Sequence, residues 1–363
     1  MAVGFFDPRR EEAAVGADLD EAIARVRSSG SLVLGPEVEA FESGFAAFCG
    51  VGHCVGVGNG TDALQLLLRA DGVGPGDEVL VPAYTAVATW MAVSLVGATP
   101  VGVDVEAGTF SLDPGSLTDR ARAVIGVDLF GHPADWDAIS QFASRHGLLV
   151  YEDAAQAHGA FWRGRRAGSL ARGAAFSFYP TKNLGALGDG GAVTTDDPAL
   201  AEHVRMLRMY GWRRRDASEI KGLNSRLDEL QAAVLRVKLA SLDAWNERRR
   251  AIASRYLAGL ADTGLGLPTS VPGAEHVWHQ FVVTHPERDV LRARLAEAGI
   301  QTLVHYDPLP HLTRAYRADG WGEGDLAVAE RLSSEALSLP MSPHLSDSEV
   351  DEVVAGVRAA AGF

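Results

Sequence analysis

Short apolar runs alternate with longer amphipathic segments along this chain, and that alternation limits the fold more than any other feature of the sequence. The apolar runs include residues 76–82, 121–127, 147–153 and 173–179. Strands that alternate with helical patterns predict βαβ units and a mostly parallel sheet. Because such sheets bind ligands outside the carboxyl ends of their strands, the polar residues that end these runs are the first candidates for a site.

A long helical pattern runs from residue 226 to residue 261, and the turn-rich segment 266–276 follows it. Residues 276–285 then predict another strand. We therefore expect an α/β protein with a large domain over residues 1–248 and a smaller C-terminal α+β domain over residues 249–363.

Composition excludes several functions. The formal net charge of −14 disfavours nucleic-acid binding, which needs Lys and Arg against the phosphates. No run of about eighteen apolar residues occurs, and no apolar stretch of signal-peptide length opens the chain, so we expect a cytoplasmic protein without a membrane partner. Cys49 and Cys54 are too few for a disulfide framework, and no second ligand cluster follows them, so we expect no metal site.

Residues 55–70 predict a strand, a glycine turn and an amphipathic helix. A helix that begins at such a turn exposes free N–H groups and the positive end of its dipole, which suits a phosphate. The turn in question is Gly58-Asn59-Gly60-Thr61-Asp62. The alternative is an ordinary strand–turn–helix unit in which Thr61 or Asp62 caps the helix.

Asp153 ends a buried strand in the segment YEDAAQAHGA, residues 151–160. A buried carboxylate needs a cationic partner, because an isolated buried charge is costly. A protonated pyridine nitrogen would be such a partner, and the pairing would keep the ring an electron sink. Gln156 is placed to hydrogen-bond a ring hydroxyl. The alternative role for Asp153 is to cap a helix or to interact with a helix dipole.

Lys182 is a lone lysine in the apolar, glycine-rich segment SFYPTKNLGALGDGGAV, residues 177–193. Desolvation lowers the pKa of a lysine and makes its amine nucleophilic. The alternative is a solvated loop lysine. Ser177 in the same segment is a candidate hydrogen-bond donor to a phosphate.

Asn224 and Arg226 precede the long helical pattern, either as surface residues or as residues that reach across a subunit interface.

Together these segments resemble the DegT/DnrJ/EryC1/StrS family of pyridoxal-phosphate-dependent sugar aminotransferases, and the similarity covers nearly the whole chain. The strings EDAAQ and SFYPTKNLGALGDGG are highly specific to that family. The resemblance implies a type I aminotransferase fold, like that of aspartate aminotransferase. It also implies pyridoxal phosphate as cofactor and an obligate homodimer with two composite active sites.

Individual roles follow from the resemblance position by position. It implies that Lys182 forms the Schiff base and moves the proton, that Asp153 pairs with the pyridine nitrogen, and that Gln156 binds the ring hydroxyl. It also implies a phosphate site made by Gly60, Thr61, Ser177 and, from the neighbouring subunit, Asn224.

Two positions depart from the family pattern. Where relatives carry an aromatic residue that stacks on the cofactor ring, this chain has Ala86. Tyr84 shares its face by strand alternation and is the candidate substitute, unless the ring is covered otherwise. Asp128 stands where many relatives have His, and we interpret it as a change in substrate contacts.

The resemblance predicts that an amino group moves from L-glutamate to a keto group of a nucleotide-linked deoxysugar, with dTDP as the expected nucleotide. The segment NSRLDELQAAVL, residues 224–235, resembles the members that aminate C-3 more than those that aminate C-4, so the resemblance favours amination at C-3. Arg226 is the candidate for the donor carboxylate, and the run Arg213–Arg215 is either a diphosphate contact or a solvated loop. The candidate substrate contacts are Tyr84, Arg226, His305 and Tyr306.

Several alternatives stay open. A C-4 sugar aminotransferase, or one that aminates a cyclitol or an aminoshikimate-type ketone, would share every cofactor residue. A dehydratase of the same family is disfavoured by the presence of Lys182 and by the two cysteines, too few for an iron–sulfur cluster. The alternative of another class is a non-catalytic, ligand-sensing protein on the same fold, which would not need the full set of Lys182, Asp153 and Gln156.

Overall fold

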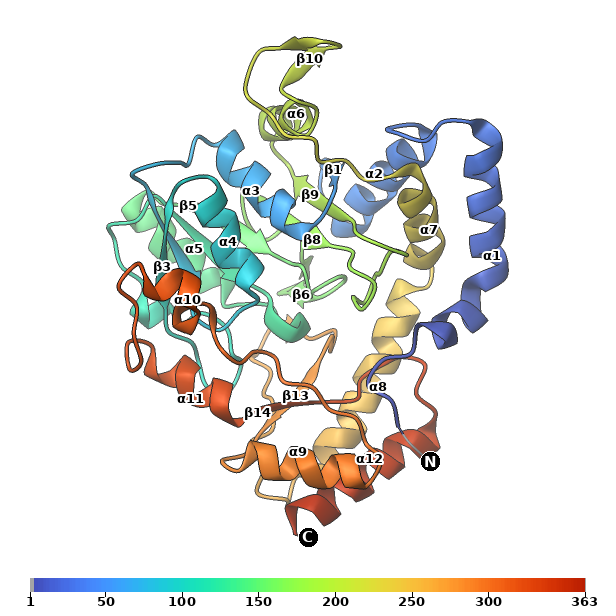
Figure 1. Cartoon of the computed structure of the whole chain (residues 1–363), viewed down its shortest axis with the longest axis vertical. Coiled ribbons are helices and arrows are strands. Elements are labelled where there is room, and N and C mark those ends of the chain that lie inside the picture. Colours follow the sequence, from blue (N-terminus) through green and yellow to red (C-terminus); the bar gives the residue numbers. More distant parts are fainter. Residues whose placement is uncertain (1–2, 363) are drawn as a thin grey trace.

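The structure, a computed structural model, describes residues 3–362 of the chain. A seven-stranded sheet with the strand order β1–β9–β8–β5–β4–β2–β3 forms the centre of the larger part (Figure 1). Within this sheet β9 runs antiparallel to both neighbours, and the other strands are parallel to one another. The strands are β1 (His53–Val57), β2 (Glu78–Pro82), β3 (Thr99–Val103), β4 (Ala123–Val127), β5 (Leu149–Asp153), β8 (Gly173–Ser177) and β9 (Gly191–Thr195).

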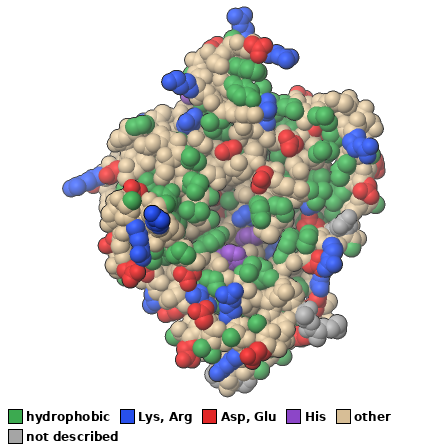
Figure 2. Space-filling view, in the orientation of Figure 1, with side chains coloured by type: hydrophobic (Ala, Val, Ile, Leu, Met, Phe, Trp, Pro, Cys, Tyr) green, Lys and Arg blue, Asp and Glu red, His purple; other side chains and the backbone are tan. Residues whose placement is uncertain are grey.

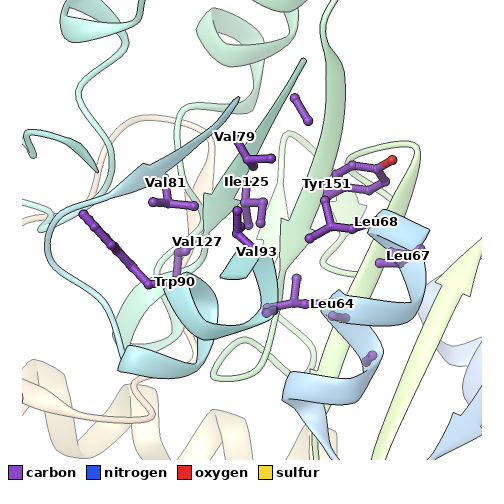
Figure 3. Packing of buried hydrophobic residues seen from close by; sticks show 14 of the residues in the cluster. Leu64, Leu67, Leu68, Val79, Val81, Trp90, Val93, Ile125, Val127 and Tyr151 are labelled. Carbon is purple, nitrogen blue, oxygen red and sulfur yellow. The ribbon is translucent and has the colours of Figure 1, made fainter. Parts of the chain in front are cut away.

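Both faces of this sheet are buried. Along β2, Val79 belongs to the core on one face and Leu80 to the core on the other. This is why the strands read as continuous apolar runs rather than as alternating patterns. On the first face, α3 (Gly60–Ala70) contributes Leu64, Leu67 and Leu68, which recur at helical spacing and pack towards the strands (Figure 3).

Helices and short elements complete the larger part. The helices against the sheet are α2 (Pro36–Cys49), α3, α4 (Val87–Leu95), α5 (Trp136–His146) and α6 (Pro198–Leu207). α7 (Glu229–Leu239) packs on α2 and on α1 (Pro8–Ser29). The short elements are β6 (Phe161–Trp162), β7 (Arg165–Arg166), β10 (Trp212–Arg214), β11 (Ala217–Ser218), β12 (Ala274–Glu275) and the 3₁₀ turns η1 (Pro114–Ser116), η2 (Leu129–Gly131) and η3 (Pro310–Leu312).

A second core lies at the C-terminal end of the chain. Tyr256, Phe281 and Val353 are among its fully buried side chains, and Val3 joins them from the N-terminal segment. The predicted domain boundary at residue 248 falls inside α8. The division of the chain into two domains at that residue remains a prediction. The elements that build this second core are α8 (Leu242–Leu260), β13 (Phe281–Thr284), α9 (Arg288–Glu297), β14 (Ala336–Leu339) and α12 (Asp347–Ala361). α10 (Arg314–Arg317) and α11 (Ala327–Glu335) instead bury Tyr316, Ala329 and Leu332 in the core of the central sheet.

Two expected elements are shorter than predicted. The helix expected over residues 226–261 is two helices, because Ser241 N–H bonds Lys238 O three residues back and interrupts the regular ladder between α7 and α8. The strand expected over residues 276–285 is reduced to β13, because Trp278 has a left-handed backbone (φ 50°). Across residues 3–362, none of the helices combines the length and the apolar character needed to span a membrane.

Candidate functional site

A cavity of about 640 Å³ opens at the carboxyl ends of the parallel strands. Segments that follow β1, β2, β4, β5 and β8 line it, together with residues 279–280 and 305–306 from the C-terminal part of the chain. Open α/β sheets bind their ligands at this position. We call it the Lys182 cavity. Figure 2 shows a hollow near the centre of one face, with histidine and basic side chains inside it.

Lys182 projects from the loop after β8 and is half-buried in the cavity wall. Burial lowers the pKa of Lys182 to about 8, and the nearby charge of Asp153 raises it in part. No hydrogen bond or ion pair joins its amine to another residue between 3 and 362. A half-buried amine with a lowered pKa and no bonded partner is suited to act as a nucleophile and a proton carrier.

Asp153 is the last residue of β5 and is 6% exposed. Its Oδ2 accepts a hydrogen bond from Thr89 Oγ1 at 2.8 Å, and its Oδ1 accepts one from Ala155 N–H at 3.2 Å. Burial raises the pKa of Asp153, whereas these hydrogen bonds and the charge of Lys182 lower it. No cationic side chain within residues 3–362 forms an ion pair with it, so its carboxylate is available to a cationic ligand in the cavity.

Gln156 is held with its amide in a defined orientation. Its Oε1 accepts from Phe130 N–H at 2.6 Å, and because that donor cannot be reversed, Nε2 is the atom that faces the cavity. Nε2 donates to Tyr306 Oη at 2.9 Å and keeps a second N–H. Gln156 therefore offers a hydrogen-bond donor to a ligand.

The start of α3 and the end of β8 approach closely beside the cavity. A Cβ on Gly60 would lie 2.8 Å from Ser177 Cβ, so a larger residue at position 60 would push the helix away. Asn59 caps α3 by accepting from Asp62 N–H at 2.8 Å, which leaves the N–H groups of Gly60 and Thr61 unused within the helix. These N–H groups and Ser177 Oγ form a cradle that suits an anion such as phosphate.

His305 and Tyr306 also line the cavity. His305 Nδ1 lies 2.8 Å from Ser338 Oγ, and burial lowers the pKa of His305 to about 4, so the ring is neutral near pH 7. Burial raises the pKa of Tyr306 to about 12. Both side chains are therefore neutral hydrogen-bonding groups in the cavity wall.

Tyr84 does not reach the cavity, and the expectation that it shares a face with Ala86 is wrong. β2 ends at Pro82, so strand alternation no longer applies at Tyr84. Its fully buried ring packs 5.1 Å from the Phe110 ring, and its hydroxyl donates to His305 O at 2.5 Å. Ala86 lines the cavity in its place.

The interpretation of Asp128 as a substrate contact is also wrong. Asp128 is fully buried and lies outside the residues that line the cavity. Its Oδ1 accepts from Ala134 N–H and from Trp136 Nε1–H, both at 2.9 Å. Asp128 also forms a side-chain hydrogen bond with the buried carboxyl of Glu152. Asp128 therefore holds the loop after β4 from behind the site.

Arg226 and Asn224 are not among the residues that line the Lys182 cavity. Arg226 borders a second cavity of about 680 Å³, where its guanidinium lies 5.9 Å from the Tyr210 ring. Trp212 lines it too and begins β10, whose hairpin stands clear of the body (Figure 1). The other arginines around this arginine cavity are Arg205, Arg213, Arg214 and Arg215. Asn224 forms a backbone bridge with Met209 beside it.

Three residues at the site escaped the sequence reasoning. Thr89 bonds Asp153 directly, and Thr85 bonds Thr89. Their four-residue spacing was the available signal, because it places both on one side of a helical turn. His279 lines the cavity beside Lys182, and no local pattern marks it.

Comparison with known proteins is consistent with this geometry. A family model described as the DegT/DnrJ/EryC1/StrS aminotransferase family matches residues 14–358. The dTDP-3-amino-3,4,6-trideoxy-alpha-D-glucose transaminase of Streptomyces venezuelae is 53% identical over 361 residues, which are 98% of this chain and 95% of that relative. The erythromycin biosynthesis sensory transduction protein EryC1 of Saccharopolyspora erythraea is 52% identical over 366 residues, which are 99% of this chain and 100% of that relative.

Two solved structures extend the similarity to the fold. The crystal structure of S. venezuelae DesV in complex with a ketimine intermediate superposes with a TM-score of 0.97 at 52% identity, and the match covers 100% of this chain and 99% of that one. The structure of NtdA from Bacillus subtilis with bound cofactor PMP has a TM-score of 0.90 at 29% identity, covering 100% of this chain and 86% of that one. The predicted fold class is thereby confirmed.

Proposed function

The chain belongs to the DegT/DnrJ/EryC1/StrS aminotransferase family, and we propose that it uses pyridoxal phosphate to move an amino group from L-glutamate to the C-3 keto group of a dTDP-linked deoxysugar. The observation that carries this proposal is the convergence of Lys182, Asp153 and Gln156 on one cavity that also contains the start of α3. The choice of C-3 and of dTDP rests on the 53% identical relative, which is named for a 3-amino dTDP-sugar.

The residues present fit pyridoxal phosphate. The cradle of Gly60, Thr61 and Ser177 matches a phosphate, because close backbone approach and free helix N–H groups favour an anion. Asp153 is a buried carboxylate without an ion-pair partner among the described residues, as expected of a group that pairs with a protonated ring nitrogen. Lys182 supplies an amine on the same cavity.

The chain's own groups then divide the chemistry between them. When bound, pyridoxal phosphate supplies an electron sink for the carbon that loses its proton. Lys182 Nζ takes that proton and returns it at the neighbouring atom, and the lowered pKa of Lys182 lets its amine do both near neutral pH. Asp153 would pair with the positive charge on the ring nitrogen, and the second N–H of Gln156 Nε2, whose first bonds Tyr306, would donate to the ring hydroxyl.

The arginine cavity supports a nucleotide-linked substrate and a composite site. Its guanidinium groups suit a diphosphate, and the rings of Tyr210 and Trp212 suit a base. Because neither Arg226 nor Asn224 lines the Lys182 cavity of its own chain, we infer that they serve the cavity of a second copy in a homodimer. Tyr179 (54% exposed) and Leu187 (57% exposed) would be covered by that partner. A cytoplasmic location stays a prediction.

Ligand sensing without catalysis is the second candidate, since a relative of 52% identity is named as a sensory transduction protein. A sensor and an enzyme would share this fold, so only the reaction with the amino donor distinguishes the two functions. A sensor would bind the cofactor or the sugar nucleotide but would not consume L-glutamate. Catalysis is favoured because a sensor has no need of the lowered pKa of Lys182.

The test begins with the absorbance spectrum of the purified protein with pyridoxal phosphate, before and after L-glutamate. Conversion from the lysine-bound form to the aminated form would support the first half-reaction, and an unchanged spectrum would favour sensing. The chain has three lysines, Lys182, Lys221 and Lys238. Borohydride trapping followed by peptide mapping should label Lys182, whereas Lys238 is held by Glu11 and by Gly185 O. A label on Lys221 or Lys238 would contradict the assignment.

A further inference from the structure

Two threonines at the start of α4 connect the cavity wall to Asp153. Thr89 Oγ1 lies 2.8 Å from Asp153 Oδ2, and Thr85 Oγ1 lies 2.9 Å from Thr89 Oγ1. Thr85 precedes the N-cap residue Ala86, and Thr89 lies in the first turn of the helix. Thr89 is fully buried, and Thr85 is 1% exposed at the cavity wall. We call Thr85, Thr89 and Asp153 the threonine chain.

The direction of each hydrogen bond follows from the charge of Asp153. An ionised carboxylate only accepts, so Thr89 donates its hydroxyl hydrogen to it. The oxygen of Thr89 is then free to accept from Thr85. A threonine inside a helix commonly bonds the carbonyl one turn earlier. Thr89 instead reaches from α4 to the end of β5, so its hydroxyl serves Asp153 rather than its own helix.

The charge of Asp153 depends on few groups. Burial raises the pKa of Asp153. The Thr89 hydroxyl, Ala155 N–H and the charge of Lys182 each lower it. Lys182 has to lose its charge to act as a nucleophile, so its contribution is not constant through the reaction. The Ala155 bond is the longer one, at 3.2 Å. Thr89 therefore provides the shorter of the two hydrogen bonds that favour the ionised carboxylate.

We propose that Thr89, oriented by Thr85, is a positioning residue that fixes the rotation and the negative charge of the Asp153 carboxylate towards the pyridine nitrogen of the cofactor. The inference rests on the proposed function for the identity of that ring. The threonine chain itself is a property of the protein and is present without any ligand. The turn that begins α4 both presents Ala86 to the cavity and brings Thr85 and Thr89 together.

Three variants separate the hydroxyl from the shape of the side chain. Thr89→Val keeps the shape and removes the hydroxyl, Thr89→Ser keeps the hydroxyl, and Thr85→Val removes the outer link alone. Thr89→Val should weaken pyridoxal phosphate binding by roughly tenfold to a hundredfold, the order of one lost hydrogen bond to a charged group. Thr85→Val should lose less, and Thr89→Ser should bind nearly as the wild type. The pH at which the absorbance of the bound cofactor is half changed should shift most in Thr89→Val, less in Thr85→Val and least in Thr89→Ser.

A titration without cofactor distinguishes this inference from the proposed function. Carboxyl-carbon NMR follows the pKa of Asp153 in the cofactor-free protein, Asp153→Asn identifies the signal, and circular dichroism checks that each variant is folded. Thr89→Val should raise that pKa, because a bond to the ionised form is lost, and Thr89→Ser should not. An unchanged pKa in Thr89→Val overturns the proposal even in an active aminotransferase. A raised pKa in a chain that fails to bind pyridoxal phosphate upholds it and overturns the proposed function instead.

Discussion

Asn183 Oδ1 lies 3.2 Å from His279 Nδ1, and this contact assigns the hydrogen on the His279 ring. Asn246 Nδ2 donates to His158 O, so Asn246 Oδ1 accepts from Asn183 Nδ2 at 2.9 Å. Asn183 Nδ2 also donates to Val277 O at 3.0 Å. Both backbone carbonyls can only accept, so Asn183 Oδ1 is an acceptor and His279 Nδ1 carries the hydrogen. The lone pair of His279 is then on Nε2, where the Gln280 amide Nε2 lies 3.5 Å away as a donor.

Asn183 should therefore stabilise the loop that carries Lys182. Asn183→Leu keeps the size of the side chain and removes three buried hydrogen bonds, so we expect it to lower the free energy of unfolding by about 2–4 kcal/mol. Urea denaturation of the cofactor-free protein measures this loss. Gln301→Ala is the control, because that amide accepts a single bond from Phe5 N–H, and it should cost less than about 1 kcal/mol. Equal losses in both variants would refute this role for Asn183.

Capture of pyridoxal phosphate should depend on the pKa of Lys182. The neutral amine is the nucleophile, and burial lowers the pKa of Lys182 to about 8. The capture rate should therefore rise roughly tenfold per pH unit below that value and level off above it. Asp153 raises the pKa of Lys182, so Asp153→Asn should move the midpoint to lower pH. Stopped-flow absorbance across the pH range checks both. A midpoint that stays in place, or rises, in Asp153→Asn would contradict the coupling.

Replacing Asp128 and Glu152 by their amides should affect stability to different extents. Both Glu152 oxygens accept backbone N–H groups, from Gly168 at 2.7 Å and from Leu170 at 3.0 Å. Asp128 Oδ1 also accepts two hydrogen bonds, so Asp128 Oδ2 is the oxygen that can carry the hydrogen shared by the two carboxyls. Burial raises the pKa of both groups, that of Asp128 well above its usual value and that of Glu152 to about 7, which agrees with Asp128 as the protonated partner. Asp128→Asn keeps a hydrogen-bond donor at this position and should change the free energy of unfolding by less than about 1 kcal/mol. Glu152→Gln places an amide N–H opposite a backbone N–H, so that two donors face each other, and should lower the free energy of unfolding by about 2–4 kcal/mol. Thermal or urea unfolding near pH 7 gives the comparison, and the reverse ranking would show the protonation to be misassigned.

Composite sites predict rescue between two defective variants. In a mixture of Lys182→Ala and Asn224→Ala subunits, a mixed dimer has one site with wild-type Lys182 from one copy and wild-type Asn224 from the other. If Asn224 acts across the interface, unfolding and refolding the two variants together should restore activity up to about half of the wild type per mixed dimer. If Asn224 acts within its own chain, the mixture should show no rescue. Arg226→Ala paired with Lys182→Ala repeats the test, and Lys182→Ala refolded alone is the control.

Much of the fold and part of the site follow from local sequence. The continuous apolar runs predicted a parallel sheet because buried strands have no polar face, and the α/β architecture is confirmed. The segments around Asp153 and Lys182 are contiguous strings, so the family resemblance they carry is also confirmed. The cradle at Gly60 was predictable because a strand, a glycine turn and a helix follow one another directly in the chain.

The tertiary structure alone decided the contacts between distant residues. Thr89 and Asp153 are 64 residues apart, and Tyr84 and His305 are 221 apart, so no local pattern could show that the first pair bonds or that the second removes Tyr84 from the cavity. Asp128 likewise looks like a site residue by position, yet packing turned it towards the buried Glu152. The physical reason is the same in each case. Local sequence determines which elements form and which faces are apolar, whereas the partner of each buried polar group depends on which elements the fold brings together.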